Sequence, residues 1–263
     1  MFELARHLVD LRCDFFVQFD DTISLQQSTF PPVYWINLDA SVSRRKTILK
    51  KFEAFEITNT HRVSAYNTSA INRIWKTGQL VLHPRIHVRL EESSQQQKHE
   101  QNIYQVAEAA CILSHLKAIK QAYDDGHDQV LVIEDDVLMS CQFVNLWRQH
   151  VDQAPMGWKI LQFVTNNPCV AEHGHDLFDP FISWQPHHWS TGAYMINRAG
   201  MQTLLDKVKP ASLPGEDVWR IDQEPIVVAD EVLYHVWRID QEPMLWQMKF
   251  CTTSLVMLTP QLG

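Results

Sequence analysis

The chain has 263 residues, of which 45% are hydrophobic and 21% are charged. This composition is typical of an ordinary globular protein, and the length is sufficient for one large α/β domain or a domain with a small appendage. The net charge of −8 argues against a nucleic-acid partner, because the neutralisation of phosphates needs a basic surface.

The sequence shows no sign of a disulfide scaffold, a leader peptide or a membrane span. Its five cysteines are scattered without CxxC spacing, which is typical of reduced thiols. The first thirty residues hold no apolar signal-peptide segment, and no uninterrupted apolar run reaches about 18 residues. We therefore expect a cytoplasmic protein without a membrane span. A piece of a longer chain that lacks its targeting segment is the alternative, and an association with a membrane surface or the secretory pathway would leave no mark here.

Three regions are expected along the chain. Residues 1–31 form an N-terminal helical extension, residues 32–250 form the main domain, and residues 251–263 form a C-terminal tail. Within the main domain, residues 66–102 are expected to be a loop or an insertion, because they lack hydrophobic periodicity and include a run rich in Ser and Gln.

The main domain begins with a predicted strand at 33–38 and a helix that carries Arg44 and Arg45 near its start. Positive charge at this end of a helix opposes the helix dipole. A solvated basic surface is the more common explanation on general grounds. The functional alternative is that Arg44 or Arg45 lies near a diphosphate.

Strands and helices then alternate to the end of the domain. Apolar residues at helical or strand-like spacing predict a helix over 106–123, a strand over 130–133, a helix over 143–151, strands over 158–164 and 193–196, and a helix after Asn197. This alternation indicates an α/β fold with a mostly parallel central sheet flanked by helices. The segment 218–225 recurs identically at 236–243, which we interpret as a short tandem duplication or an assembly artefact in the sequence.

Three adjacent carboxylates, Glu134, Asp135 and Asp136, directly follow the predicted strand 130–133. Adjacent acids repel one another, and their burial is costly without a counter-charge. At the carboxyl end of a central strand, where α/β proteins bind ligands, that counter-charge is naturally a divalent cation. On an extended chain, Glu134 and Asp136 point the same way. An exposed acidic turn is the alternative, and the triplet alone does not decide between the two.

A series of landmarks resembles the pattern of glycosyltransferase family 25, which includes lipooligosaccharide and procollagen galactosyltransferases. The landmarks are Asn37-Leu38-Asp39 with Arg44-Arg45, Glu108 to Leu116, Ile133 to Asp136, Ser190 to Tyr194, and Ala229 to Tyr234. The resemblance covers about residues 32–235. Ala107 departs from the glycine usual in the family, and neither the 66–102 segment nor the duplicated segment fits the pattern.

The resemblance implies a GT-A-like (Rossmann-like) fold and a metal-dependent, inverting transferase. Such an enzyme moves a hexose, with galactose as the first candidate, from a nucleotide-diphosphate sugar such as a UDP-sugar to a hydroxyl of a glycan or glycoprotein acceptor. A Mn²⁺ or Mg²⁺ ion would bridge the diphosphate and the carboxylates. The expected metal ligands are Glu134 and Asp136, with His235 as a third. The expected donor-binding residues are Asn37, Asp39, Arg44, Arg45, Glu108, Ser114, His115 and Asp135.

Inverting transfer also needs a carboxylate that deprotonates the acceptor hydroxyl. Asp230 is the first candidate and Glu231 the second, although a helix N-cap explains Asp230 equally well. Ser114 and His115 are either structural or donor-binding, since a histidine between leucines on a helix is more often a buried core residue.

Two other functions stay open. A catalytically inactive relative that binds carbohydrate or a partner would explain the departure at Ala107. A Mg²⁺-dependent phosphoryl-transfer enzyme could use the same acids, but the chain has no Walker-type glycine-rich loop and only eight glycines in all.

Overall fold

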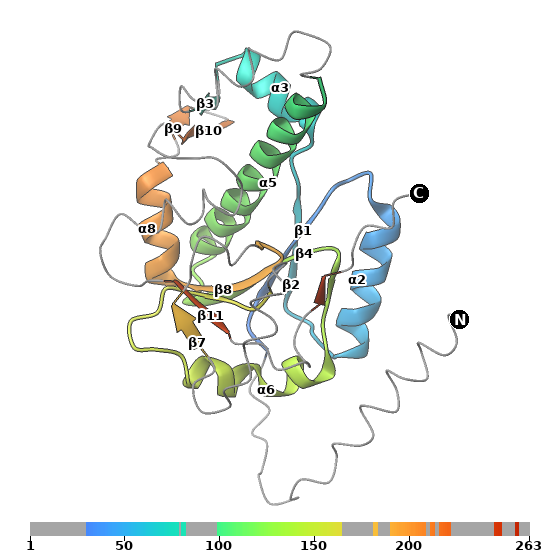
Figure 1. The fold of residues 1–263 in the computed structure, drawn as a ribbon, viewed down its shortest axis with the longest axis vertical. Coiled ribbons are helices and arrows are strands. Elements are labelled where there is room, and N and C mark those ends of the chain that lie inside the picture. Colours follow the sequence, from blue (N-terminus) through green and yellow to red (C-terminus); the bar gives the residue numbers. More distant parts are fainter. Residues whose placement is uncertain are drawn as a thin grey trace, which may run out of the picture.

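The structure is a computed structural model that describes residues 30–78, 80–82, 99–164, 181–183, 190–208, 211–213, 216–221, 245–248 and 256–257. Within these residues, a seven-stranded sheet with the order β2-β1-β4-β8-β6-β11-β7 forms the centre of the molecule (Figure 1). Its strands are β1 (Val33–Asn37), β2 (Thr60–Ser64), β4 (Gln129–Glu134), β6 (Ile160–Gln162), β7 (Phe181–Ser183), β8 (Ala193–Asn197) and β11 (Leu245–Met248).

The sheet is mixed. The pairs β1–β2, β1–β4 and β6–β11 are parallel, whereas β8 is antiparallel to both β4 and β6, and β7 is antiparallel to β11. Thus β2, β1, β4, β6 and β11 run in one direction, and β8 and β7 run in the other. The predicted α/β class is confirmed. The reversal at β8 escaped the prediction because a buried strand has the same apolar pattern in either direction.

Helices cover both faces of the sheet (Figure 1). On one face, α5 (His99–Asp124) and α8 (Arg198–Val208) pack on alternate strand residues such as Val130 and Val132. On the other face, α2 (Val42–Ala54) and α6 (Cys141–Asp152) pack on the intervening residues, such as Leu131 and Ile133. Alternate residues of β4 therefore contribute to two separate apolar cores, one on each face of the sheet. This explains why the whole apolar run of β4 is buried.

The 66–102 segment contains more regular structure than predicted. Helix α3 (Thr68–Lys76) begins at Asn67, whose side chain accepts a hydrogen bond from the amide of Ala70, and β3 (Leu80–Leu82) follows. Helix α5 already begins at His99. The interpretation as a loop is wrong for these residues, because the apolar residues of α3 have helical spacing and bury Ile71. The remaining residues of the segment, 79 and 83–98, lie outside the described residues, and the domain boundaries remain predictions.

Two small sheets complete the described structure. Strand β10 (Glu216–Ile221) pairs with β3 and with β9 (Ala211–Leu213), and β12 (Val256–Met257) pairs with β5 (Val137–Leu138). Residues 1–29 and most of the duplicated segment lie outside the described residues. None of the helices in the described part of the chain has the length and hydropathy that a bilayer crossing needs.

Candidate active site

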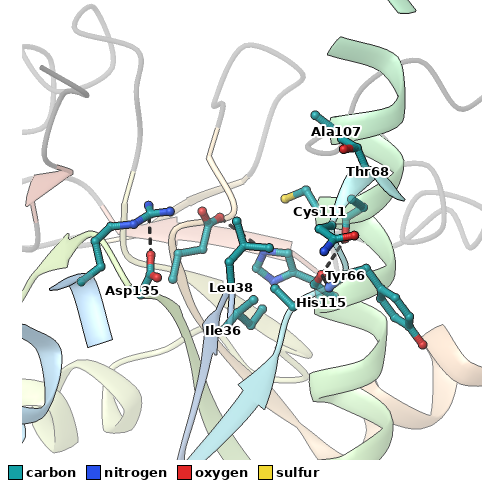
Figure 2. Close-up of a pocket in the computed structure, with 14 residues that line it drawn as sticks. Ile36, Leu38, Tyr66, Thr68, Ala107, Cys111, His115 and Asp135 are labelled. Atoms are coloured by element: carbon teal, nitrogen blue, oxygen red, sulfur yellow. Dashed lines mark hydrogen bonds and ion pairs between the residues drawn. The ribbon is translucent and has the colours of Figure 1, made fainter. Parts of the chain in front are cut away.

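A cavity of about 300 Å³ lies where β1, β2 and β4 end and face helix α5 (Figure 2). These three strands are parallel neighbours, so their carboxyl ends meet at one edge of the sheet, the usual ligand-binding edge of α/β proteins. Five residues predicted from the sequence line this cavity: Arg44, Ser114, His115, Glu134 and Asp135. The loop after β2 adds Tyr66 and Asn67, α3 adds its first residue, Thr68, and α5 adds Cys111.

The acid triplet divides into two groups with different partners. Strand β4 ends at Glu134, and the chain turns at Asp135 and Asp136. Arg44 Nη1 lies 3.1 Å from Asp135 Oδ1 and donates to Asp136 Oδ2 across 3.0 Å. Glu134 instead contacts α5 and Thr191, two residues before β8 begins. The expected extended geometry, with Glu134 and Asp136 on the same side, therefore does not continue beyond Glu134.

Asn37 is the polar centre behind the triplet. Its side chain is 1% exposed, and its amide group donates to Asp135 Oδ2 across 2.5 Å and to the carbonyl of Ser41 across 3.2 Å. Its carbonyl oxygen accepts from Arg45 Nε at 3.0 Å and from Arg62 Nε at 3.1 Å. Two donated and two accepted bonds use the full capacity of an asparagine amide. Asn37 therefore fixes Asp135 from behind.

Asp39 and Arg62 extend this network toward solvent. Arg62 on β2 donates to Asp39 Oδ1 and to the carbonyl of Asn37, and Ser64 donates to Asp39 Oδ2. The hydrogen bonds from Arg62 and Ser64 lower the pKa of Asp39. Arg45 also donates to the carbonyl of Asp39 across 2.8 Å. Of the predicted donor-binding residues from β1 to α2, Asn37, Asp39 and Arg45 thus support the site from behind, and Arg44 lines the cavity.

Glu134 is held from the opposite side. Thr191 donates to Glu134 Oε1 across 2.8 Å, and His115 Nε2 lies 3.3 Å from the same oxygen. His115 is buried, and its Nδ1 lies 3.1 Å from the hydroxyl of Tyr194 on β8. The antiparallel register of β8 on β4, together with a bond from the amide of Glu134 to the carbonyl of Gly192, brings Thr191 to the end of β4. The three residues after Ile133 therefore lie between α2 and α5.

The pKa directions distinguish Glu134 from the two aspartates. Burial by itself would raise the pKa of Glu134, but the interactions with His115, Thr191 and Arg44 outweigh it and lower the pKa. For Asp135 and Asp136, burial dominates and raises the pKa, and repulsion by Glu134 adds to it even though Arg44 acts in the opposite direction. The two aspartates therefore carry more negative charge than their surroundings compensate.

The two aspartates fit a divalent cation. Asp136 Oδ1 is buried and has no hydrogen-bond partner among the described residues. The same nitrogen of Arg44 lies near both carboxylates, so one positive charge faces two negative charges. Carboxylate oxygens are the ligands that Mg²⁺ and Mn²⁺ prefer. Asp135 and Asp136 would hold such an ion, and Glu134 lies next to them in the chain.

The remaining predicted residues fall in three places. Ser114 donates to the carbonyl of Ala110 and accepts from the amide of Tyr66, so its hydroxyl ties α5 to the loop after β2. Glu108 is half-buried on α5 and is not among the residues that line the cavity. Asp230, Glu231 and His235 lie outside the described residues, so their roles remain predictions.

Sequence reasoning assigned no role to Arg62, Thr191, Tyr194 or Cys111. Thr191 and Tyr194 stand in a family landmark, but the contacts of Thr191 with Glu134 and of Tyr194 with His115 depend on the antiparallel pairing of β8 with β4. Cys111 precedes His115 by four residues, and this helical spacing is a signal that the sequence does offer. Arg62 has no such signal, because only the pairing of β2 with β1 brings it to Asn37.

The chain belongs to glycosyltransferase family 25 (LPS biosynthesis protein), whose sequence profile matches residues 30–219. It is 30% identical over 126 residues to the lacto-N-neotetraose biosynthesis glycosyltransferase LgtB of Neisseria meningitidis serogroup B (strain ATCC BAA-335 / MC58), a match that covers 44% of this chain and 44% of LgtB. The corresponding LgtE protein of the same strain is 29% identical over 134 residues, which are 47% of this chain and 46% of LgtE. The matches thus span less than half the length of these relatives.

A solved glycosyltransferase involved in the glycosylation of the major capsid of PBCV-1 is also similar to this chain, with a TM-score of 0.34, 10% identity and coverage of 69% of each chain. That similarity is too low to define a fold. The sheet order and the helices on both faces do so, and they form the GT-A-like α/β class that the family resemblance implied.

Proposed function

We propose that this protein transfers a hexose from a nucleotide-diphosphate sugar to a hydroxyl group of a glycan or glycoprotein. Galactose carried by UDP is the first candidate donor, and the reaction is expected to invert the anomeric centre. One observation carries the proposal: the buried Asp136 Oδ1 has no hydrogen-bond partner among the described residues, and the preceding residue, Asp135, lines the cavity. A site of this kind suits a cation–diphosphate pair better than it suits a free carbohydrate.

The ends of β1 and β4 would position the donor. A Mn²⁺ or Mg²⁺ ion held by Asp135 and Asp136 would supply positive charge that offsets the charge developing on the departing nucleotide. Arg44 would turn from the two aspartates toward the diphosphate, since its side chain is 45% exposed and has room to do so. The apolar wall at Ile36 and Leu38 offers a surface for the nucleoside.

The remaining groups would hold this arrangement in place. Asn37 orients Asp135, and Thr191 and His115 orient Glu134. Glu134 is the metal ligand first expected from the sequence, and its lowered pKa keeps it ionised beside the two aspartates. The acceptor hydroxyl needs a base, for which Asp230 is the first candidate and Glu231 the second, while His235 stays a candidate third ligand.

The relatives indicate the kind of acceptor. LgtB and LgtE are named for lacto-N-neotetraose biosynthesis, and the family description refers to LPS biosynthesis. An oligosaccharide acceptor is proposed by analogy alone, since the matches cover 44% of LgtB and 46% of LgtE. The individual acceptor sugar and the linkage are to be found by experiment.

The test is the release of UDP from UDP-galactose, with and without Mn²⁺ and with a panel of oligosaccharide acceptors. The wild-type chain should release UDP only when Mn²⁺ is present, and Asp136→Asn should lower the rate by at least about 100-fold. Asp124→Asn is the matched control, because Asp124 is an exposed aspartate at the end of α5 that pairs with Lys120. Equal release by wild type and Asp136→Asn would contradict the proposal. Mn²⁺-dependent UDP binding without any release would instead support the catalytically inactive relative.

A further inference from the structure

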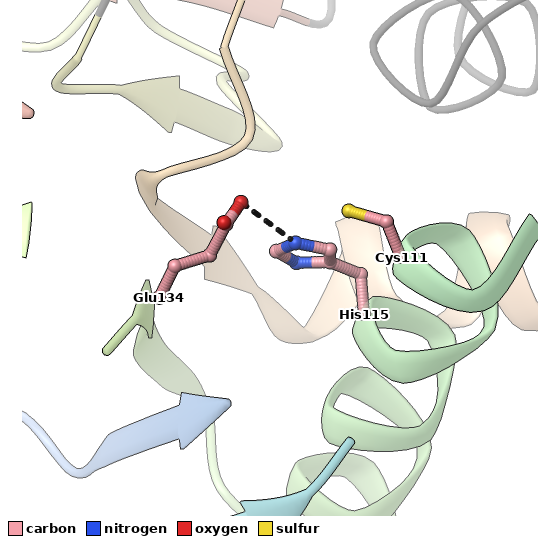
Figure 3. A group of neighbouring side chains, drawn as sticks. All are labelled: Cys111, His115 and Glu134. Carbon is pink, nitrogen blue, oxygen red and sulfur yellow. Dashed lines mark hydrogen bonds and ion pairs between the residues drawn. The ribbon is translucent and has the colours of Figure 1, made fainter. Parts of the chain in front are cut away.

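Three potential metal ligands of different chemical type meet on the α5 side of the cavity (Figure 3). Cys111 and His115 lie one turn apart on α5, and Glu134 reaches them from the end of β4. Cys111 Sγ, a ring nitrogen of His115 and a carboxylate oxygen of Glu134 all lie within 4.8 Å of one another. We refer to these three residues as the mixed-ligand cluster. Cys111 is a thiol that forms no disulfide.

The spacing of the mixed-ligand cluster is close to that of a zinc site. Two ligands bound to one tetrahedral zinc ion stand about 3.4 Å apart if each bond is about 2.0–2.1 Å long. His115 Nε2 and Glu134 Oε1 are 3.3 Å apart. The other separations do not exceed 4.8 Å, so side-chain adjustments of about 1 Å bring the sulfur to zinc-binding distance.

Each member of the cluster also has a supporting partner of the kind that orients metal ligands. His115 Nδ1 lies 3.1 Å from the hydroxyl of Tyr194, so a proton on Nδ1 leaves Nε2 free to coordinate. Thr191 donates to Glu134 Oε1 across 2.8 Å, and its hydroxyl also lies 3.9 Å from Cys111 Sγ. Such outer contacts fix the tautomer of a ligating histidine and the direction of a ligating carboxylate. Polar side chains that meet by chance would not be expected to have such supporting partners.

We propose that Cys111, His115 and Glu134 form a site for a borderline-soft divalent cation, with Zn²⁺ as the best-matched ion. One sulfur, one nitrogen and one oxygen ligand favour zinc over Mn²⁺ or Mg²⁺, which prefer oxygen alone. Three protein ligands leave a fourth coordination position, as in catalytic zinc sites. Since all three residues line the cavity, that position opens toward it.

The mixed-ligand cluster differs from the cation site proposed for the donor in both its ligands and its partners. Asp135 and Asp136 offer oxygen alone and face Arg44 on α2, whereas the cluster includes sulfur and nitrogen from α5. Glu134 lies between the two groups. The zinc site does not depend on the proposed transferase activity, so it can be tested without a sugar nucleotide.

The experiment uses the full chain, freed of metal by a chelator under reducing conditions and titrated with Co²⁺ as a spectroscopic substitute for Zn²⁺. We expect a near-ultraviolet thiolate-to-cobalt absorption band at a stoichiometry of one ion per chain, together with the visible bands of a tetrahedral site. Cys111→Ser should remove the thiolate band, and His115→Gln should weaken cobalt binding at least about 10-fold. Zn²⁺ should displace the Co²⁺, and Mn²⁺ should not.

Cys141→Ser is the matched control, because Cys141 is the first residue of α6, a helix that packs on the opposite face of the sheet from α5. This variant should keep the full thiolate band. Circular dichroism of each variant without metal checks that the fold is retained. Absence of the band in the wild type, or its survival in Cys111→Ser, would overturn the proposal. Manganese-dependent UDP binding is measured separately on the same samples, so that failure of the zinc site and failure of the transferase proposal are told apart.

Discussion

Arg44 Nη1 donates to Asp136 Oδ2 across 3.0 Å, and the same nitrogen lies 3.1 Å from Asp135 Oδ1. This contact explains an unusual helix. The first turn of α2 has no acidic residue, although its exposed amide groups would favour one. Instead, α2 presents a guanidinium to the carboxylates that follow β4. The positive charge at the start of α2 therefore serves the neighbouring strand end rather than its own helix.

Replacing Arg44 should change the binding of cation and nucleotide in opposite directions. In Arg44→Gln, Mn²⁺ no longer competes with a guanidinium for Asp135 and Asp136, so we expect it to bind more tightly without nucleotide. UDP should bind about 10-fold more weakly in the presence of Mn²⁺, because one charge-assisted contact to the diphosphate is lost. Isothermal titration calorimetry measures both affinities.

Lys46→Gln is the control for this pair of measurements. It removes one positive charge from an exposed position on the same helix, whereas the ion pairs of α2 with Asp135 and Asp136 in the described part of the chain come from Arg44. The effect of Lys46→Gln on both affinities should be small. If Arg44→Gln weakens Mn²⁺ binding, or if Lys46→Gln matches it, the exchange of Arg44 between acids and diphosphate is excluded.

Asp136→Asn should stabilise the metal-free protein. Burial and repulsion from Glu134 and Asp135 raise the pKa of Asp136 in the fold in spite of Arg44. A carboxyl group with a raised pKa costs stability once it ionises, and asparagine does not ionise. At neutral pH, we expect a gain of about 1 kcal/mol in the free energy of unfolding, or about 2–4 °C in Tm.

The stability gain of Asp136→Asn should depend on pH. Below the ordinary aspartate pKa of about 3.9, Asp136 is protonated in both folded and unfolded chains, so the advantage of Asp136→Asn should vanish there. As pH rises through the raised pKa, the advantage should grow to its full size. Thermal unfolding followed by circular dichroism across this range provides the check. A variant that is less stable than the wild type at neutral pH would show that the contact with Arg44 outweighs the burial of the charge.

Asn37→Ala should destabilise the protein because it removes the hydrogen-bond partner of several polar side chains. Asn37 is buried and bonds with Asp135, Arg45 and Arg62 through one amide group. Its removal leaves Asp135 without its buried donor, and we expect a loss of about 2–3 kcal/mol in the free energy of unfolding. Urea denaturation measures this loss. Asn59→Ala, which truncates an exposed asparagine just before β2, should change the stability by less than about 0.5 kcal/mol.

The sequence alone was sufficient for the overall fold class. The apolar run 130–133 with three acids directly after it predicted a buried strand and a charged site at its end, and β4 and the cavity agree with that. These features are local: side-chain type and spacing along one segment decide them. The basic start of α2 also singled out Arg44, which the structure places in the cavity lining beside Asp135.

Features that depend on pairing between distant segments were not predictable. Thr191 reaches Glu134 because β8 runs antiparallel to β4, and Arg62 reaches Asn37 because β2 pairs with β1. Strand direction and register leave no mark in a fully buried apolar segment. The expectation that Glu134 and Asp136 lie on the same side of an extended chain failed for a different reason. The chain turns directly after Glu134, so the two carboxylates have different partners.

Thr191→Val should destabilise the protein in a pH-dependent way. The hydroxyl of Thr191 donates to Glu134 and helps to lower the pKa of that carboxyl group. An acid with a lowered pKa stabilises the fold above its ordinary pKa of about 4.3, and this contribution is lost as pH falls through the lowered value. Valine keeps the shape without the hydroxyl, so we expect a loss of about 1 kcal/mol at neutral pH that narrows in acid.

Thr47→Val is the comparison for this effect. Thr47 is exposed on α2, where its hydroxyl donates to the carbonyl of Ser43 rather than to a carboxylate. Chemical denaturation at neutral pH and at about pH 3 measures both variants. A loss for Thr191→Val that is the same at both pH values would mean that the hydroxyl does not act through the charge of Glu134.

The aspartates after β4 are proposed to bind a nucleotide diphosphate through a divalent cation. Equilibrium binding of UDP with and without Mn²⁺, measured by calorimetry on the wild type and on Asp136→Asn, is the decisive measurement. We predict that the wild type binds UDP when Mn²⁺ is present, that a chelator abolishes this binding, and that Asp136→Asn weakens it by at least about 100-fold, or about 2.7 kcal/mol. UDP binding that is unaffected by the chelator, or that is as tight in Asp136→Asn as in the wild type, would contradict the claim.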